Sequence, residues 1–358
     1  MAADAGPSGA AAVSGAEAAA SPVVPRRLAI IAHYDPRGKA APHFLRLLDQ
    51  IGGSFSDVVV ASTAALDDEA IAAIEARATL VRRPNVGHDF GSWRDVLEAH
   101  GFGADFDEVL LTNDSYVGYL RPLDQMIREM HKQPVEVWGM TKSHRHGEHI
   151  QSYFLYFTAA ALHSQTFERF WAELRPAHSR DQAIVDQEIG VSRALLQSGF
   201  RLGSYFTPTT LERRLATVRG VHWLRHRQRT FPTRFDNFED SFFRARKFMD
   251  PAMADNLNWS AAFADAVFDR ARLPVVKFDT LRYDPYFLDA GHFLNELERA
   301  FPAAFSGVRQ FLEETKPYYG RRRFENYGDT KLMLPTRALV GYGNRHPIST
   351  AQRAKETS

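Results

Sequence analysis

Short apolar runs alternate with amphipathic stretches over the first part of the chain. The runs at 28–32, 57–61, 79–81, 108–112 and 135–139 have the length and the apolar content of buried strands. Apolar residues at helical spacing lie between these runs, near 42–51, 67–76, 92–100 and from 122 onward. Asp67 is a suitable N-cap for the second of these helices. This alternation predicts an α/β fold, a Rossmann-type, mostly parallel sheet with helices on both faces.

The pattern changes after residue 140. A polar, histidine-containing loop is expected at 141–150, and a strand at 151–158. Two helices are predicted next, over 158–174 and 183–199, with Gly199 as a suitable terminator of the second. The remainder is mainly helical and aromatic, with one helix expected to open at 256–259 and another at 291–300.

Composition divides the chain into four parts. Residues 1–26 are rich in alanine and small polar residues, and we expect a disordered leader there, not a signal peptide. Residues 27–210 are predicted to form the α/β domain, 211–343 a helical, basic and aromatic C-terminal region, and 344–358 a flexible tail. The basic part of the third segment contains the arginines Arg213, Arg214, Arg219, Arg225, Arg227, Arg229 and Arg234.

The overall composition excludes several classes of site. The chain has 358 residues, no cysteine and a formal net charge of +1. Disulfides, thiolate metal sites and a cysteine nucleophile are therefore excluded. The near-neutral charge gives no electrostatic reason to expect nucleic acid as a partner. The apolar runs are shorter than the roughly 18 residues of a membrane-spanning helix.

Two polar, turn-rich segments follow predicted strands. The first, from Asn85 to Trp93, contains His88 and Asp89 together with glycines. The second is Asn113-Asp114-Ser115, at the end of the 108–112 strand. In open α/β sheets, ligands bind beyond the carboxyl ends of the strands, where both segments are expected to lie. These residue types are also common in ordinary turns, which is the alternative explanation.

Each segment suggests a way of binding a ligand. Gly87 and Gly91 would let the backbone approach a ligand closely. The N-terminus of the helix expected from about Ser92 would offer free N–H groups to an anion. Asp114 is a candidate ligand of a divalent cation, because such ions prefer hard oxygen donors.

Several short motifs together resemble the rhamnan synthesis protein F family. They are Asn85-x-Gly87-x-Asp89, Leu111-x-Asn113-Asp114-Ser115, Trp138-Gly-Met-Thr141, His149-Ile-Gln-Ser152-Tyr-Phe, Leu273-Pro-x-x-Lys277 and Arg282-x-Asp284-Pro285. The resemblance extends over about residues 27–290, and His88 departs from it where arginine is expected. It implies a bacterial glycosyltransferase of cell-wall or lipopolysaccharide assembly. Such an enzyme moves a sugar, often a deoxyhexose such as rhamnose, from a nucleotide diphosphate donor to a polysaccharide or lipid-linked acceptor.

A wider resemblance is to inverting glycosyltransferases of the GT-A type, which implies a GT-A-like fold. Those enzymes carry a metal-binding acidic motif after the fourth strand, where this chain has a single carboxylate, Asp114. Mg²⁺ or Mn²⁺ is the implied cofactor, with metal independence as the alternative. Their catalytic base lies at the start of a helix that ends in Gly plus an aromatic residue. Counting back from Gly199 places Glu188 at that position, with Asp186 as its rival.

The resemblance completes the expected site. The donor-binding residues are expected to be His33, Asn85, Gly87, His88, Asp89, Asn113, Asp114, Ser115 and His149. Residues 27–210 would bind the nucleotide sugar and 211–343 would lie on the acceptor side. The arginine-rich segment could contact membrane phosphates, which would place a cytoplasmic protein at the inner face of the cytoplasmic membrane.

Two other functions are compatible with parts of the sequence. One is a non-catalytic nucleotide- or carbohydrate-binding module, because the acidic motif has only one carboxylate. The other is a dinucleotide-dependent oxidoreductase, which the missing G-x-G-x-x-G after the first strand disfavours.

Overall fold

The structure, a computed structural model, describes residues 1, 25–145, 147–217, 254–255, 257–286 and 288–319. Nearly all of the expected leader, the whole expected tail and five of the seven arginines, from Arg219 to Arg234, lie outside the described residues. Of the other two, Arg213 forms an ion pair with Asp255, with 2.5 Å between Nη1 and Oδ1.

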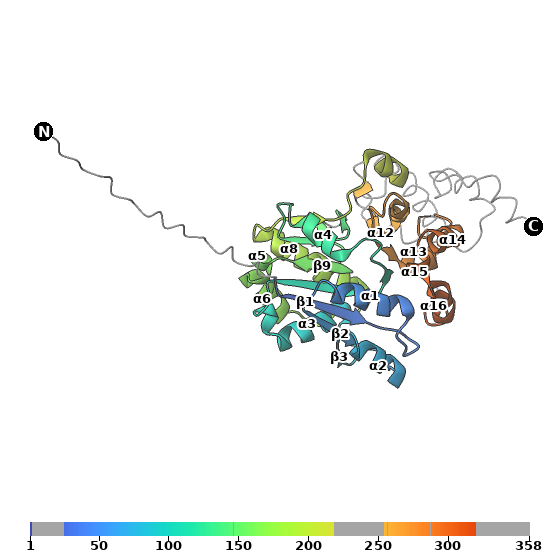
Figure 1. Cartoon of the computed structure of the whole chain (residues 1–358), viewed down its shortest axis with the longest axis horizontal. Coiled ribbons are helices and arrows are strands. Elements are labelled where there is room, and N and C mark those ends of the chain that lie inside the picture. Colours follow the sequence, from blue (N-terminus) through green and yellow to red (C-terminus); the bar gives the residue numbers. More distant parts are fainter. Residues whose placement is uncertain (2–24, 146, 218–253, 256, 287, 320–358) are drawn as a thin grey trace, which may run out of the picture.

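A seven-stranded sheet forms the centre of the molecule (Figure 1). Its strands, in order across the sheet, are β10 (Leu202–Ser204), β6 (Val137–Gly139), β9 (Phe154–Phe157), β4 (Glu108–Asn113), β1 (Arg27–His33), β2 (Asp57–Ser62) and β3 (Thr79–Arg82). Neighbouring strands are parallel, except that β9 is antiparallel to both β4 and β6. The predicted fold class, a mostly parallel sheet with helices and a helical C-terminal region, is confirmed.

The central strand β1 shows how both faces of this sheet are covered. Its residues alternate in direction, as the pleat of a strand requires. Ala29 and Ile31 belong to the core beneath α1 (Pro42–Gly52) and α4 (Leu123–Met130). Leu28, Ile30 and Ala32 belong to the core beneath α3 (His88–Ala99), α6 (Gln165–Ala172) and α8 (Ile189–Gln197). A continuous apolar run is therefore what a strand buried on both faces needs.

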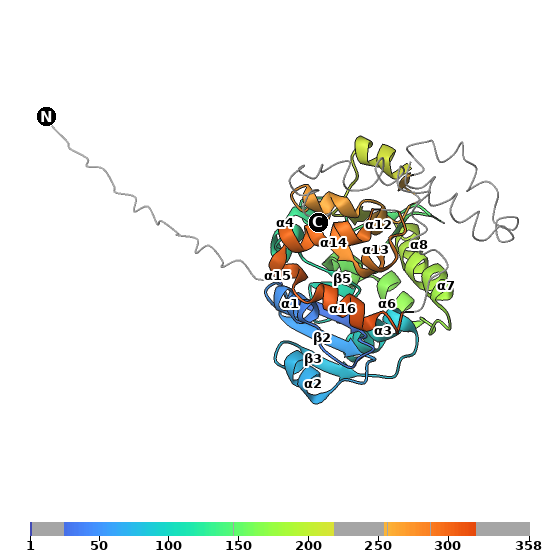
Figure 2. The same ribbon diagram turned by 90° about the vertical axis from the view of Figure 1, so that its right-hand side faces the viewer.

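The described C-terminal region is mainly helical and lies against one side of the sheet domain (Figure 2). Its elements are α12 (Trp259–Ala262), η4 (Ala264–Phe268), β11 (Val276–Lys277), α13 (Phe278–Tyr283), α14 (Ala290–Ala300), α15 (Pro302–Phe305) and α16 (Val308–Thr315). Strand β11 pairs antiparallel with β5 (Tyr116–Val117), which follows β4. This pairing brings a segment distant in sequence next to the acidic turn.

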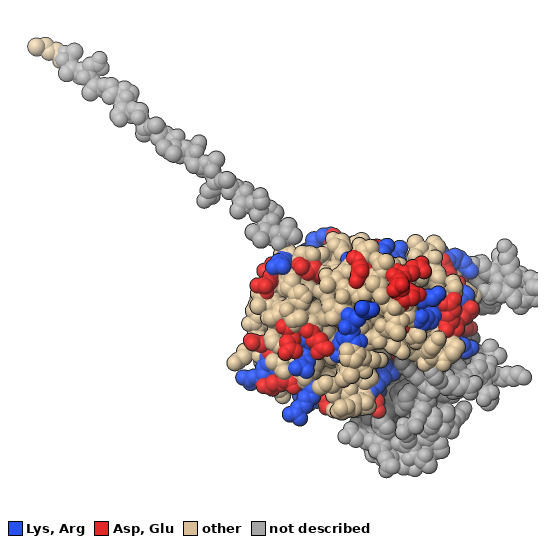
Figure 3. Space-filling view, turned by 90° about the horizontal axis from the view of Figure 1, so that it is seen from below, with Lys and Arg blue, Asp and Glu red and all other residues tan. Residues whose placement is uncertain are grey.

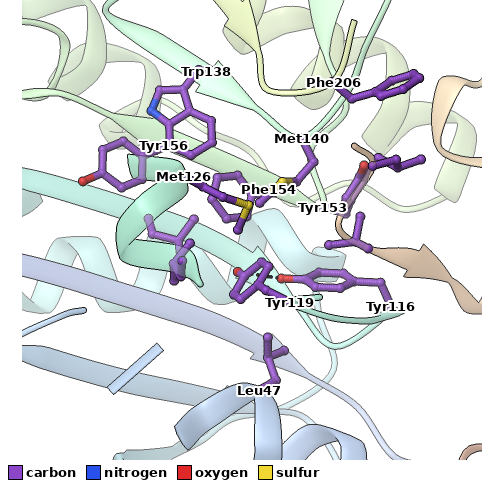
Figure 4. Packing of buried hydrophobic residues seen from close by; sticks show 14 of the residues in the cluster. Leu47, Tyr116, Tyr119, Met126, Trp138, Met140, Tyr153, Phe154, Tyr156 and Phe206 are labelled. Carbon is purple, nitrogen blue, oxygen red and sulfur yellow. Dashed lines mark hydrogen bonds between the residues drawn. The ribbon is translucent and has the colours of Figure 1, made fainter. Parts of the chain in front are cut away.

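Aromatic side chains pack behind that turn (Figure 4). The hydroxyls of Tyr116 and Tyr119 lie 2.9 Å apart, and Thr112 Oγ1 lies 2.8 Å from the Tyr116 hydroxyl. Tyr153 is buried beside them, and its hydroxyl lies 2.8 Å from Thr141 Oγ1. Because each buried hydroxyl has a partner, this aromatic cluster gives the turn a rigid support.

Several predicted boundaries were wrong. The helix expected from Ser92 is α3, which begins at His88 because Gly87, with φ 80°, turns the chain into it. The single helix expected at 158–174 is two, α5 (Ala159–Leu162) and α6, since the Ser164 hydroxyl accepts from the Phe167 N–H and starts a second helix. The N-cap predicted for α2 (Asp68–Glu75) is confirmed, because Asp67 accepts from the Ala70 N–H at 2.8 Å.

The loop expected at 141–150 contains a short antiparallel pair, β7 (Lys142–Ser143) with β8 (His149–Ile150). The helix expected at 183–199 begins as a π-helix, η2 (Ala183–Glu188), preceded by α7 (Arg180–Gln182), and continues as α8 to Gln197. Gly199, with φ 85°, follows its end. The strand expected at 151–158 is confined to β9.

The surface of the described part carries charges of both signs. Lys and Arg side chains are interspersed with Asp and Glu on the face seen in Figure 3. Among the helices of the described ranges, none combines the length and the apolar content needed to cross a bilayer.

Candidate active site

The sheet changes its direction of growth between β1 and β4. From β1 the chain adds β2 and β3 on one side, and β4 then pairs with the other side of β1. Ligands of open α/β sheets bind at such a switch point, beyond the carboxyl ends of the strands. His33 ends β1 and Asn113 ends β4, so the residues that follow them meet here.

Asp114 is held at this point by the backbone. Its Oδ2 accepts a hydrogen bond from the Tyr34 N–H at 3.0 Å, and His33 Nε2 lies 3.8 Å away. The pKa of Asp114 is raised to about 7, mainly by burial and also by the nearby carboxylates of Asp89 and Asp35, while the hydrogen bond from the Tyr34 N–H opposes the rise. A cation or a hydrogen-bond acceptor bound here would therefore change the protonation of Asp114 near neutral pH.

His33 is the buried side chain next to Asp114. Its ring is buried and stacks on Phe44, with 4.3 Å between ring centroids, and Nδ1 lies 3.0 Å from Ser62 Oγ. Burial lowers the pKa of His33 to about 4, although Asp35 opposes that change. The imidazole is thus neutral at physiological pH, and Nε2 is the nitrogen on the Asp114 side.

A directed chain of hydrogen bonds links both polar segments. Asn113 Nδ2 donates to Asp89 Oδ2 at 2.7 Å, and Asn113 Oδ1 accepts from the Ser115 hydroxyl at 2.6 Å. Ser115 Oγ in turn accepts from Lys277 Nζ at 2.6 Å. Burial raises the pKa of Asp89, while Asn113 and Lys277 oppose the rise. Asp89, Asn113, Asp114 and Ser115 are therefore brought together as expected.

The remaining residues of the first segment lie differently. Asn85 and His88 are exposed. Gly87 is buried and has φ 80°. A Cβ on Gly91 would lie 2.4 Å from the Val86 carbonyl oxygen, so this glycine lets the preceding loop pack on α3. The contact with Val86 thus explains why position 91 requires glycine, without a ligand.

Glu188 reaches the same region from η2. Its Oε2 accepts the Ser152 N–H at 2.7 Å and also the Ser152 hydroxyl. Its Oε1 lies 3.8 Å from His149 Nε2. Because His149 Nδ1 lies 2.9 Å from the Gly147 carbonyl, which can only accept, Nδ1 carries a proton. The charge of Glu188 acts on Asp89, Lys277 and Tyr153, which places it in the same electrostatic cluster.

Asp186 has different surroundings. It is exposed and lines a cavity of about 480 Å³ together with Phe170, Glu173, Leu174, Arg175, Ala177, Gln182 and Gln187. None of the residues hydrogen-bonded around Asn113 and Asp114 lines that cavity. The structure therefore groups Glu188, and not Asp186, with the residues at the switch point.

The carboxylates around Asp114 do not make a dedicated metal site. Both oxygens of Asp35 accept hydrogen bonds from Arg37, and one oxygen of Asp89 accepts from Asn113. Within the residues that the structure describes, no group of three or more His, Asp, Glu or Cys side chains could hold a metal ion. A Mg²⁺ or Mn²⁺ ion at Asp114 would meet a carboxylate of which one oxygen already accepts the Tyr34 N–H.

Three contributions were missed by the sequence analysis. They are the Tyr34 N–H, the pair of Ser152 donors and the Lys277 ammonium. Ser152 and Lys277 stand within motifs that carried the family resemblance, but nothing in their spacing indicated these contacts. The backbone N–H of Tyr34 has no sequence signal, because every residue except proline carries one.

Four of the six motifs, those between Asn85 and Phe154, lie within the part of the chain that matches a known family. The model of the family described as rhamnan synthesis protein F matches residues 58–224. An uncharacterized protein of Sinorhizobium fredii (strain NBRC 101917 / NGR234), y4gN, is 24% identical over 186 residues, which are 51% of this chain and 49% of the relative. The chain thus spans about half the length of the curated relative that it matches.

The solved structures to which this chain is similar include a mannosyltransferase and a glucosyl-3-phosphoglycerate synthase. The mannosyltransferase PcManGT from Pyrobaculum calidifontis, in complex with GDP-Man and Mn²⁺, is 14% identical, with 82% of this chain and 86% of that chain covered and a TM-score of 0.36. Glucosyl-3-phosphoglycerate synthase from Mycobacterium tuberculosis, in complex with UDP, is 12% identical, with 49% and 81% covered and a TM-score of 0.29. At these values the similarity does not indicate a shared substrate. The resemblance found in the sequence is nevertheless confirmed by the family model, and residues 58–224 are the part of the chain that matches the rhamnan synthesis protein F family.

Proposed function

We propose that this chain is a glycosyltransferase that moves a sugar from a nucleotide diphosphate donor to a glycan acceptor. The observation that carries the proposal is the cluster at the β1–β4 switch point, where Asp114 is fixed by the Tyr34 N–H and Asn113 joins Asp89 to Ser115. The match to the rhamnan synthesis protein F family supports the same activity.

The donor is proposed to bind at the carboxyl ends of β1 and β4. Asp114 accepts from the ribose hydroxyls of the donor, and the turn residues Asn113 and Ser115 lie at its diphosphate, beside His33. The segment from Asn85 to Asp89 and His149 form the edges of the donor site. Residues 27–210 would then supply most of the donor contacts and residues 211–343 the acceptor side, except that Lys277 of the second part reaches the donor turn.

Glu188 is proposed as the general base. The acceptor hydroxyl would give its proton to Glu188 while its oxygen attacks the anomeric carbon and the bond to the diphosphate breaks. The Ser152 N–H and hydroxyl fix one oxygen of the carboxylate, which leaves Oε1 on the His149 side to receive the proton. A single base on the face opposite the leaving group is sufficient for inversion, so an inverting mechanism is proposed.

The donor sugar and acceptor follow from the family resemblance. A deoxyhexose such as rhamnose is the proposed sugar, and a cell-surface polysaccharide or a lipid-linked glycan is the proposed acceptor. Lipid-linked acceptors would place the reaction at the inner face of the cytoplasmic membrane. Arginines of the 213–234 segment are proposed to contact phosphates there.

A thermal-shift comparison tests whether the protein binds a donor nucleotide, as the proposal requires. UDP, dTDP and GDP would each be compared with NAD, because a ligand that binds only the folded state raises Tm. At least one nucleoside diphosphate is expected to raise Tm and NAD is not. The opposite result would favour a dinucleotide enzyme. Binding of a nucleotide sugar without transfer to any glycan acceptor would favour the non-catalytic module.

A further inference from the structure

Lys277 reaches the acidic turn from the C-terminal region. In the β5–β11 pair it lies opposite Tyr116, and the N–H of the next residue, Phe278, donates to the Ser115 carbonyl at 3.0 Å. These backbone bonds fix the Lys277 side chain beside the turn Asn113–Ser115, although 162 residues separate Lys277 from Ser115.

The ammonium group of Lys277 is only partly used by the protein. It donates to Ser115 Oγ at 2.6 Å and lies 4.4 Å from the ring centroid of Tyr153. An ammonium has three N–H donors, so donors remain for a ligand. The residue as a whole is half-buried.

Two further hydrogen bonds connect Ser115, the partner of Lys277, to Asp89, and they polarise the bond from the Lys277 ammonium. The Ser115 hydroxyl donates onward to Asn113, so its oxygen is free to accept from Lys277, and Asn113 donates to Asp89. This series of hydrogen bonds therefore has the Lys277 ammonium at one end and the Asp89 carboxyl group at the other. Burial lowers the pKa of Lys277, while Asp279, Asp89 and Glu188 oppose that change. A bound anion would favour the charged ammonium in the same way.

Other cationic groups of the described residues near this turn are already paired. Arg180 Nη2, whose charge acts on Lys277, lies 3.6 Å from Asp279 Oδ2. Arg37 donates to both oxygens of Asp35 and also pairs with Glu314 of α16. A leaving diphosphate needs compensating positive charge, which in many phosphate sites comes from Mg²⁺ or Mn²⁺. Here the protein offers the Lys277 ammonium, whereas the described residues contain no group of three or more His, Asp or Glu side chains that could hold a cation.

We propose that the Lys277 ammonium binds the donor diphosphate and compensates its charge, so that donor binding and transfer need no divalent cation. This inference rests on the proposed function. In the reaction, the bond from the anomeric carbon to the diphosphate breaks with its electron pair on the diphosphate oxygen, and Lys277 stabilises that oxygen by a charge-assisted hydrogen bond.

Calorimetric titration of the full chain tests the inference. UDP, dTDP and GDP would be titrated in excess EDTA and again with Mn²⁺, first into the wild type. The nucleotide that binds would then be titrated into Lys277→Met, Lys277→Arg and Lys132→Met. Lys132 is exposed and lies two residues beyond the end of α4, so its variant is the matched control for loss of one positive charge.

The expected result has three parts. The wild type binds equally well in EDTA and in Mn²⁺. Lys277→Met weakens binding by roughly 10–100-fold, the scale of one hydrogen bond to a charged group. Lys277→Arg recovers part of the loss because it keeps the charge, and Lys132→Met binds like the wild type.

Contrary results separate the two hypotheses. Binding lost in EDTA and restored by Mn²⁺ would overturn metal independence, and the wild type alone decides this even where Lys277→Met does not fold. Unchanged affinity in a folded Lys277→Met would remove Lys277 from the donor site. If none of the three nucleotides binds the wild type under either condition, the proposed function itself fails, and the inference fails with it.

Discussion

The backbone N–H of Tyr34 donates to Oδ2 of Asp114 at 3.0 Å, which joins the residue after β1 to the residue after β4. One hydrogen bond thus fixes a carboxyl group at the switch point of the sheet. In this position burial disfavours the charged form of Asp114 and raises its pKa to about 7. A carboxyl group whose pKa is raised in this way at a strand end is a candidate for function, because strongly shifted pKa values are common at functional sites.

The first prediction concerns the effect of this raised pKa on the stability of the folded protein. The pKa of Asp114 is higher in the folded than in the unfolded protein, so this residue's contribution to stability falls as pH rises from about 4 to about 7. Asp114→Asn keeps an oxygen for the Tyr34 N–H and removes the charge. At pH 8 we expect the variant to be more stable than the wild type, by on the order of 1 kcal/mol or more.

Thermal unfolding at pH 5 and pH 8 measures this difference. The advantage of Asp114→Asn over the wild type should be larger at pH 8, while its affinity for the donor nucleotide should be lower. Asp105→Asn, at an exposed position, is the control and should show no such change with pH. An advantage that is the same at both pH values would contradict the raised pKa.

The second prediction compares two helical glycines. A Cβ on Gly91 of α3 would lie 2.4 Å from the Val86 carbonyl oxygen, which is backbone and cannot rotate away. The nearest atom to a Cβ on Gly190 of α8 is Phe170 Cε2, at 3.7 Å. Gly91→Ala should therefore destabilise the protein by about 1–3 kcal/mol. Gly190→Ala should stabilise it by roughly 0.5–1 kcal/mol, because alanine favours a helix.

Urea unfolding of both variants provides the measurement. The changes in the free energy of unfolding are expected to have opposite signs. Helix propensity alone would make both substitutions stabilising, so the destabilisation of Gly91→Ala would come from the contact with Val86. Stabilisation by Gly91→Ala would mean that the segment ending at Gly87 does not pack on α3 as described. Asp89 lies in the first turn of α3, next to this contact, so the donor affinity of Gly91→Ala should also fall.

Local patterns predicted the sheet well and the long-range contacts poorly. The run at 28–32 is buried on both faces and so is apolar throughout, which identifies a strand without knowledge of its partners. The Asp67 N-cap is likewise a local feature. The position of Lys277 depends on the pairing of β11 with β5, two strands of two residues each, too short to carry a pattern.

The candidate site shows the same division. Asp89, Asn113, Asp114 and Ser115 were predicted together because both segments follow strands, and ligands of open α/β sheets bind beyond the carboxyl ends of the strands. The start of α3 at His88 was missed because Gly87, and not a Ser, Thr or Asp N-cap, precedes it. The choice between Glu188 and Asp186 was open in the sequence, because the π-helical turn that separates their surroundings has no recognisable pattern. Their catalytic roles stay predictions.

The third prediction concerns a buried histidine next to the candidate site. His43 of α1 lies between the rings of Phe278 and Phe311, with centroid distances of 4.8 Å and 4.5 Å. Burial lowers its pKa to about 3. Because the unfolded chain binds a proton near pH 6.5 and the folded one does not, stability is lost as pH falls from about 6.5 toward 3. His43→Phe should remove this loss, on the order of 2 kcal/mol between pH 7 and pH 5.

Melting temperatures of the wild type and His43→Phe at pH 7 and pH 5 test this. The variant should lose less of its Tm on acidification than the wild type does. His163→Phe, at an exposed position, is the matched control and should follow the wild type. Equal losses in all three proteins would show that His43 is not the group responsible.

The fourth prediction separates binding from chemistry at two carboxylates in one helical segment. Glu188 accepts two hydrogen bonds from Ser152 and lies beside His149, whereas Asp186 is exposed at a different cavity. Glu188→Gln keeps an oxygen for Ser152 but cannot take a proton from the acceptor. It should leave donor affinity within about twofold and reduce turnover by roughly 10²–10⁴, the usual contribution of a general base.

Asp186→Asn removes one negative charge two residues away and is the matched control. Because Asp186 has no hydrogen bond to the cluster around Asn113, Asp114 and Ser115, its variant should keep both donor affinity and turnover. Donor titration by calorimetry and a radiolabelled transfer assay on both variants decide the assignment. Full turnover in Glu188→Gln would remove this residue from the mechanism. An inactive Asp186→Asn that still binds the donor would make Asp186 the base, and the cavity that it lines would then be the place to look for the acceptor.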